Sequence, residues 1–210
     1  MNLAELKAAH ERKKGAIRKR LAEFSQIKNS TSEKIFYELC YCVMTANGSA
    51  KAARVAQNFL EKNNFWKYGV IGDCLKGVRF RNREEYILQN RKNILADKLN
   101  LCEFLSGNSF ALREKIVSDK EHFKGLSWKE SSHFLRNIGF GGLAILDRYI
   151  LKNLENFRVI EERPKTLTKK RYFEIEQKMK EFSERVGIPI DELDVVLWTE
   201  GSGTSVEEAK

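Results

Sequence analysis

Apolar residues recur along this chain at intervals of three and four positions, which is the spacing of one face of an α-helix. Strict alternation of apolar and polar residues, which marks a half-buried strand, does not recur. Only two prolines, Pro164 and Pro189, interrupt the pattern. The hydrophobic pattern therefore predicts a nearly all-α fold.

Several helix signals lie in the first half of the chain. Ser30 followed by Glu33 is a capping-box pattern, which predicts the start of a helix that ends near the segment TANGSA. Ser49 is the predicted cap of the next helix. The residues expected to face inward on that helix are Ala52, Val55, Phe59 and Leu60. Helical spacing resumes over residues 87–99.

The second half of the chain continues in the same way. A helix is predicted over residues 114–123 and another over 128–139. A long surface helix is expected over 168–187, and a short apolar helix over 191–198. The remaining segment, about residues 199–210, is polar and rich in Gly and Ser, so we expect it to be mobile unless it docks.

A Gly-centred turn joins two of these predicted helices and gives a helix-hairpin-helix pattern at about residues 113–139. The backbone amides of such a turn, with the positive end of the second helix, point at an anion such as a DNA phosphate. The predicted phosphate contacts are Lys124, Gly125 and Ser127. An ordinary turn between helices explains the same residues about equally well.

A lysine and an aspartate near this turn are candidates for chemistry. Lys129 stands in the first turn of its helix, where the dipole disfavours the charged amine, and a neutral lysine is a nucleophile. Asp147 follows the apolar run LAIL. It is buried if one helix covers residues 143–154, but it is the N-cap if the helix begins at Arg148. We favour the cap, because an unpaired buried carboxylate is costly; this role can be purely structural.

Composition indicates the kind of partner. The chain has 38 Lys and Arg against 29 Asp and Glu, and its net charge of +9 predicts an anionic partner, with nucleic acid as the leading candidate. A basic surface that only keeps the protein soluble is the alternative. The 210 residues, 42% of them hydrophobic, suffice for one compact domain or two small lobes with a real core.

The sequence contains no apolar run long enough for a signal peptide or a membrane span. We therefore expect a protein that does not contact membranes and that acts in the cytoplasm. We also expect a monomer with no obligatory protein partner.

The cysteines and histidines do not indicate a metal site. Neither C-x-x-C spacing nor a His cluster is present, and most of the cysteines have apolar neighbours, which favours reduced core thiols. A nucleotide-binding Gly loop is also absent. We expect no metal and no cofactor.

A basic cluster surrounds an aromatic residue in the loop before residue 87. Phe80 is flanked by Arg79, Arg81 and Arg83, and such a group can wedge or hold nucleic acid. A connecting loop that buries its Phe is an equally good explanation of these residues.

Six stretches taken together resemble one protein family. They are ELCYCVMTANGSA, RNREEYILQNRK, WKESSHFLRNIG, LAILDRYIL, PKTLTKKRYFEIE and LDVVLW, in this order, and they span most of the chain from about Ser32 to Trp198. They resemble the helix-hairpin-helix superfamily of DNA glycosylases, specifically the archaeal-type 8-oxoguanine DNA glycosylase/AP lyases. The pair WKESSHFLRN and AILDR is specific.

The resemblance implies a two-lobed α-helical fold with the hairpin at a central cleft, and a prokaryotic repair enzyme that acts on damaged double-stranded DNA. By motif position, it implies that Lys129 is the nucleophile and Asp147 the essential carboxylate. The damaged base must be flipped out of the duplex. Trp198 is the candidate for stacking in the base pocket, and Phe80 for the wedge or the pocket.

The resemblance also implies that a C-terminal lysine, here Lys210, helps to distinguish 8-oxoguanine from guanine. Two features depart from the family pattern. The segment after Trp198 is longer and less basic than expected, and Ser127 stands where a second glycine is expected.

Other functions are compatible with the same residues. A pyrimidine-lesion glycosylase of the endonuclease III type shares the hairpin, the lysine and the aspartate, but it usually carries an iron–sulfur cluster, and no cysteine follows Cys102. A glycosylase without lyase activity would not need Lys129. A non-catalytic hairpin that binds DNA, and a protein-interaction scaffold, are the two alternatives without chemistry.

Overall fold

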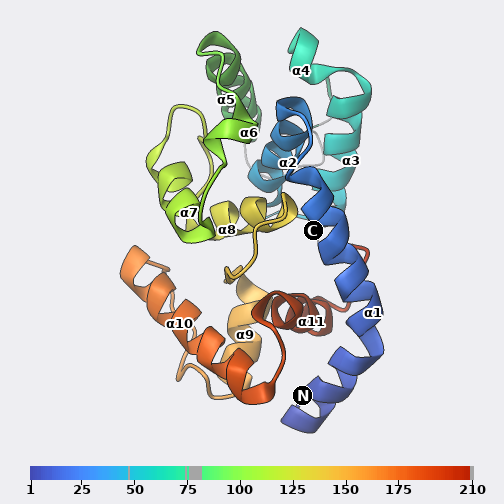
Figure 1. The fold of residues 1–210 in the computed structure, drawn as a ribbon, viewed down its shortest axis with the longest axis vertical. Coiled ribbons are helices and arrows are strands. Elements are labelled where there is room, and N and C mark those ends of the chain that lie inside the picture. The colour runs from blue at the N-terminus through green and yellow to red at the C-terminus, as the bar shows by residue number, and fades with distance from the viewer. Residues whose placement is uncertain (47, 74, 76–81, 209–210) are drawn as a thin grey trace. The chain divides into compact units, whose positions relative to one another are not determined.

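The computed structural model describes residues 1–46, 48–73, 75 and 82–208, and all regular structure in them is helical (Figure 1). The all-α prediction is confirmed for this part of the chain. The helices are α1 (Leu3–Ile27), α2 (Ser32–Thr45), α3 (Ala50–Lys62), α4 (Phe65–Tyr68), α5 (Arg83–Ala96), α6 (Leu101–Phe104), α7 (Ser109–Ser118), α8 (Trp128–Asn137), α9 (Arg148–Asn156), α10 (Lys169–Val186) and α11 (Ile190–Ser202).

The chain folds into two compact units. One unit contains Phe24–Phe140, and the other contains Met1–Glu23 and Gly141–Lys210. Helix α1 begins in the second of these units and ends in the first. We refer to them as the hairpin unit and the terminal unit.

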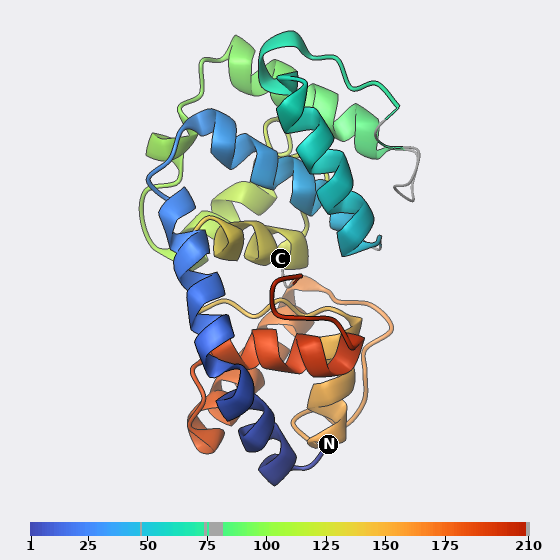
Figure 2. The same ribbon diagram turned by 90° about the vertical axis from the view of Figure 1, so that its right-hand side faces the viewer.

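Helix α2 is the centre of the hairpin unit. Every residue of α2 from Ile35 to Thr45 is buried, and α2 packs against α3, α5, α6 and α8 (Figure 2). A helix that is mainly apolar on all sides must be covered on all sides, and the neighbours of α2 cover it from Ile35 to Thr45. The Glu38 carboxylate in its middle accepts hydrogen bonds from Gln57 Nε2 at 3.0 Å and Asn137 Nδ2 at 3.1 Å. These bonds hold the last residue of α8 against the core.

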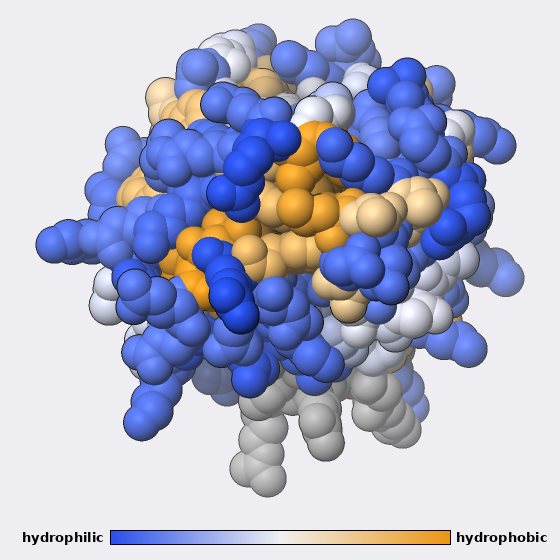
Figure 3. Space-filling view, turned by 90° about the horizontal axis from the view of Figure 1, so that it is seen from below, coloured by the Kyte–Doolittle hydropathy of each residue, from blue (hydrophilic) through white to orange (hydrophobic). Residues whose placement is uncertain are grey.

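The terminal unit is built on contacts of α11 with α9 and α10. Helix α1 is attached to α11 by polar contacts, because Glu192 accepts from His10 Nε2 at 2.6 Å and from Arg18 Nε at 2.8 Å. Hydrophilic side chains cover most of the face that Figure 3 shows, around an apolar area near its centre. This is the distribution expected when amphipathic helices turn their polar residues to solvent.

Some boundaries differ from the predictions. Thr31, not Ser30, caps α2, and its side chain accepts from Lys34 N, whereas the Ser30 hydroxyl donates to Ile27 O. Helix α7 ends at Ser118, so that residues 114–118 of the predicted helix are helical and residues 119–123 are not. Helices α1, α4 and α6 were not predicted.

The inward face of α3 was predicted wrongly in part. Ser49 caps α3 as expected, and Leu60 is buried, but Val55 is 64% exposed and Phe59 41% exposed. The buried face consists of Ala53, Ala56, Gln57 and Leu60. Small side chains let α3 approach its neighbour α2 closely, so helical spacing of large apolar residues pointed to the wrong side.

The C-terminal segment is attached to the terminal unit, although its polar composition predicted mobility. Helix α11 extends to Ser202 and not only to Trp198. Lys13 Nζ donates to Thr199 Oγ1 at 2.9 Å and to Glu200 Oε1 at 2.7 Å. Val206 is only 5% exposed. Residues 199–206 are therefore docked on the fold.

Candidate functional site

The turn between α7 and α8 has the backbone of a helix-hairpin-helix motif. Gly125 has φ +91°, and a Cβ atom on it would lie 2.7 Å from Tyr86 Cδ2. Glycine is thus required both for the backbone conformation and for the close approach to Tyr86. The Lys124 side chain is partly exposed, and its Nζ donates to Glu85 Oε1 at 3.3 Å.

Lys129 lies in the first turn of α8, as predicted, with its side chain 21% exposed. Its Nζ donates to Glu130 Oε1 at 3.1 Å. The other carboxylate oxygen, Oε2, accepts from Ser127 N at 3.3 Å and from the Ser127 hydroxyl. Glu130 therefore connects the last residue of the hairpin turn to the amine of Lys129.

Glu130 was not predicted as a site residue, although the sequence contains a signal for it. Ser127 followed by Glu130 has the S-x-x-E spacing of a capping box. Burial raises the pKa of the Glu130 carboxyl, but the Lys129 ammonium and the hydrogen bond from Ser127 outweigh this effect and hold its pKa below the usual range. Glu130 is thus a buried carboxylate that stays ionised at neutral pH.

A second lysine, Lys120, contacts the hairpin turn through its side chain. Its Nζ donates to Leu126 O at 2.9 Å. Burial lowers the pKa of Lys120 below its ordinary value, and the attraction of Glu130 opposes this shift only in part. Lys120 is therefore the amine to compare with Lys129 in any test of covalent chemistry.

His122 lies between two acidic side chains. Its Nδ1 lies 2.9 Å from Asp119 Oδ2, and its Nε2 lies 2.9 Å from Asp97 Oδ2. Burial lowers the pKa of His122, but the hydrogen bonds and the charges of Asp119 and Asp97 outweigh it and raise this pKa above 6.5.

We predict a pH-dependent stability from this raised pKa. The bridging imidazolium stabilises the fold fully below the unfolded-state pKa, and the contribution is lost as pH rises through the higher folded-state value. The free energy of urea unfolding, compared between the native chain and His122→Gln, should therefore differ most near about pH 6 and converge towards about pH 9, beyond the usual histidine range. Parallel pH profiles of the two proteins would contradict the prediction.

Asp147 is the N-cap of α9 in the terminal unit, as predicted. Its Oδ1 accepts from Tyr149 N at 2.8 Å and from Ile150 N at 2.9 Å, and its side chain is partly exposed. The alternative, a single helix over residues 143–154, is wrong. An aspartate that caps a helix places its carboxylate at the end of the helix, where solvent and a ligand can reach it.

Buried acids fix the backbone that leads to Asp147. The amide of Ala144 donates to Glu176 Oε1 at 2.9 Å, and the amide of Ile145 donates to Asp194 Oδ2 at 3.0 Å. Tyr172 in turn donates its hydroxyl to Ala144 O at 2.6 Å. An extended apolar segment without strand neighbours needs such partners for its buried amides, and α10 and α11 supply them.

Two aromatic side chains lie beside the cap. Tyr149 and Trp198 are both partly exposed, and their ring centroids are 6.5 Å apart at an interplanar angle of 89°. Arg148 Nη2 donates to the Tyr149 hydroxyl at 2.7 Å. Trp198 is thus not a core residue, and it belongs to the same local group as the first turn of α9.

The predicted site residues fall into two groups. Lys124, Gly125, Ser127 and Lys129 follow one another in the hairpin unit, whereas Asp147 and Trp198 belong to the terminal unit. Phe80 and Lys210 lie outside the described residues. Of the arginines near Phe80, Arg83 is described, and its Nη2 donates to Ala46 O at 2.9 Å.

The described residues offer neither a metal site nor a membrane span. Among them, no group of three or more His, Cys, Asp or Glu side chains could hold a metal ion. In that same part of the chain, no helix is both long and apolar enough to cross a membrane.

Comparison with known proteins identifies the family of this chain. The model of a family described as 8-oxoguanine DNA glycosylase matches residues 17–188. The 8-oxoguanine DNA glycosylase/AP lyase of Fusobacterium nucleatum is 38% identical over 205 residues, which cover 95% of this chain and 94% of the relative. The enzyme of the same name from Methanocaldococcus jannaschii is 38% identical over 191 residues, 88% of each chain.

Solved structures show the same fold. The crystal structure of the Thermotoga maritima 8-oxoguanine DNA glycosylase matches with a TM-score of 0.85 and 35% identity, over 97% of both chains. The Methanocaldococcus jannaschii 8-oxoguanine glycosylase/lyase, crystallised with a 15mer DNA that contains 8-oxoguanine, matches with a TM-score of 0.79 and 33% identity, over 96% of this chain and 99% of that one. Fold, sequence and motifs agree, and this protein belongs to the 8-oxoguanine DNA glycosylase family.

Proposed function

We propose that this protein is a bifunctional DNA repair enzyme that excises 8-oxoguanine from duplex DNA and then cleaves the strand at the abasic site. The observation that carries the proposal is the position of Lys129. It is a partly buried amine in the first turn of the helix that follows the hairpin turn, in a chain related to 8-oxoguanine DNA glycosylase/AP lyases over 95% of its length.

The hairpin turn holds the DNA backbone in this proposal. Amides at Gly125 and Ser127, at the N-terminus of α8, face a phosphate, and Lys124 adds a positive charge. Ser127 N donates to Glu130 in the free protein at 3.3 Å, which is a long hydrogen bond. A phosphate oxygen therefore competes with the Glu130 carboxylate as the acceptor for this amide.

Lys129 supplies the nucleophile. In the free protein its ammonium is paired with Glu130, and loss of one proton to solvent gives the amine. The amine nitrogen attacks C1′ of the damaged nucleotide, the C1′–N9 bond breaks, and the base leaves with that electron pair and takes up a proton. Ring opening gives a Schiff base between Nζ and C1′. Removal of a C2′ proton then expels the 3′ phosphate by β-elimination, and the strand is cut.

Asp147 stabilises the positive charge that develops on the sugar as the base leaves. Its Oδ1 is held by two amides of α9, so the carboxylate is already oriented before DNA binds. A fixed charge that needs no rearrangement is effective in a transition state. The target base reaches these groups only after it is flipped out of the duplex, and Trp198 is the proposed stacking partner of the flipped base.

The proposal extends to the partner and the lesion. Damaged double-stranded DNA is the partner, bound by a monomer without cofactor. Two roles stay predictions: selection of 8-oxoguanine by Lys210, and the wedge or pocket role of Phe80.

Single-turnover cutting of defined duplexes tests the proposal. We expect cleavage of a duplex with one 8-oxoguanine, and little or none of duplexes with an oxidised pyrimidine or no lesion. Cleavage mainly at the oxidised pyrimidine would favour the endonuclease III type, and binding without cleavage of any duplex would favour the non-catalytic hairpin.

A further inference from the structure

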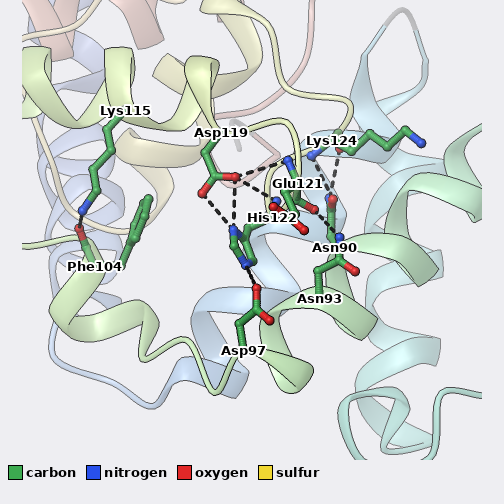
Figure 4. A network of polar contacts seen from close by, with 9 residues as sticks. All are labelled: Asn90, Asn93, Asp97, Phe104, Lys115, Asp119, Glu121, His122 and Lys124. Carbon is green, nitrogen blue, oxygen red and sulfur yellow. Dashed lines mark hydrogen bonds and ion pairs between the residues drawn. The ribbon is translucent and has the colours of Figure 1, made fainter.

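One face of α5, with its C-cap Asp97, contacts the hairpin turn over residues 121–125. Tyr86, Asn90, Asn93 and Asp97 stand at spacings of four, three and four positions, so they lie on the same side of the helix. Each contacts the turn, and Figure 4 shows the polar members of this face with their partners. We refer to these four residues as the α5 face. The α5 face has no part in the proposed chemical steps.

Asn90 makes the central contact. Its Oδ1 accepts from Lys124 N at 2.8 Å, and its Nδ2 donates to Lys124 O at 2.9 Å (Figure 4). Asn90 is 1% exposed. A side-chain amide has both a donor and an acceptor, so one asparagine satisfies both backbone groups of Lys124, as a neighbouring strand would.

The flanking contacts fix the turn on both sides of Lys124. Asn93 Nδ2 donates to Glu121 O at 2.8 Å, and Asp97 Oδ2 lies 2.9 Å from His122 Nε2. On the other side, the ring of Tyr86 lies so close to Gly125 that a Cβ atom there would be 2.7 Å from it. The α5 face therefore sets the backbone of residues 121–125, which includes the Gly125 amide that is proposed to face a phosphate and leads to that of Ser127.

A fixed turn matters for DNA binding in particular. Backbone amides bind an anion well only when they converge on one point, and a turn that contains glycine has more conformations to lose than other turns. Pre-organisation before binding lowers the entropy lost on binding and raises affinity without any new contact. Lys129 lies beyond this turn, on α8, and α8 is held separately through Asn137 and Glu38.

We infer that Asn90 is a positioning residue for DNA binding. It holds the backbone of Lys124 so that the amides of the hairpin turn face a DNA phosphate. The inference rests on the proposed function of the hairpin. It predicts a defect in DNA binding, not in the chemical steps.

The test compares Asn90→Ala with Gln89→Ala, a matched change at the adjacent, exposed position of α5. Affinity for an undamaged duplex is measured at several salt concentrations, and the cutting rate of an 8-oxoguanine duplex is measured at saturating protein. We expect Asn90→Ala to bind about tenfold more weakly than Gln89→Ala. Asn90 also holds the backbone that carries the positive charge of Lys124, so the slope of log K against log salt should be shallower by about 0.9, the contribution of one neutralised phosphate. The cutting rate at saturation should stay within about twofold of native.

The outcomes separate this inference from the proposed function. Equal affinity and equal salt slope for the two variants would overturn the role of Asn90. Absence of cutting by the native protein, with binding intact, would overturn the proposed function alone. If Asn90→Ala fails to fold, Asn90→Ser takes its place, because it is neutral and its single short hydroxyl cannot bond both Lys124 N and Lys124 O. The same loss of affinity is expected, and native affinity and slope would overturn the inference.

Discussion

Lys129→Gln is expected to bind an 8-oxoguanine duplex with nearly native affinity and to cut it at least about 10³-fold more slowly than the native protein, because it removes the nucleophile. Glutamine keeps much of the length of the side chain and can still donate to Glu130, so the first turn of α8 should stay in place. Binding is measured by titration, and cutting in single turnover.

A matched control removes the same charge elsewhere. Lys178 on α10 is exposed, and Lys178→Gln should cut at the native rate. Loss of binding together with cutting in Lys129→Gln would mean that this lysine grips the phosphate backbone, and the nucleophilic role would be wrong.

Asp147→Asn is expected to slow base release by about 10² to 10³-fold, the usual loss when one preorganised electrostatic group is removed from an active site. Asparagine is as good an N-cap as aspartate, so the hydrogen bonds to Tyr149 N and Ile150 N should persist. The substitution therefore removes the charge and keeps the cap. Base release is followed by chromatography of free 8-oxoguanine, and folding by thermal unfolding.

Asp147→Ala provides the comparison for the structural role. It loses both the cap and the charge, and should be less stable than Asp147→Asn by about 1 kcal/mol. If Asp147→Asn releases base at the native rate while Asp147→Ala is unstable, Asp147 is a structural cap only.

Short sequence motifs were enough to predict the hairpin turn with Lys129 after it, and Asp147 as the N-cap of α9. The cap at Asp147 was predictable because the alternative buries a charge, and the turn at Gly125 because a glycine between two helical patterns marks a break in the helix. Glu130 was equally readable from its spacing to Ser127. Helix caps and turns depend on residues a few positions apart, so they can be predicted from the sequence alone.

Contacts between distant segments could not be predicted in this way. Asn90 lies at helical spacing between Ile87 and Ile94, so the pattern of α5 places it on the buried face, but its partner Lys124 is 34 positions away and no local pattern identifies it. The attachment of the C-terminal segment depends on Lys13, which is 186 positions from Thr199. On α3 the large apolar residues Val55 and Phe59 face outward, because the packing against α2 uses small side chains. Only the folded chain brings these partners together.

Borohydride trapping shows whether Lys129 is the nucleophile, because it captures the Schiff base between the protein and the sugar. The native chain, Lys129→Gln and Lys120→Gln are each incubated with duplexes that contain 8-oxoguanine, an oxidised pyrimidine or no lesion. We expect a covalent adduct of the native chain and of Lys120→Gln with the 8-oxoguanine duplex, and none for Lys129→Gln. An adduct that persists in Lys129→Gln, or no adduct with any duplex despite salt-sensitive binding, would contradict it.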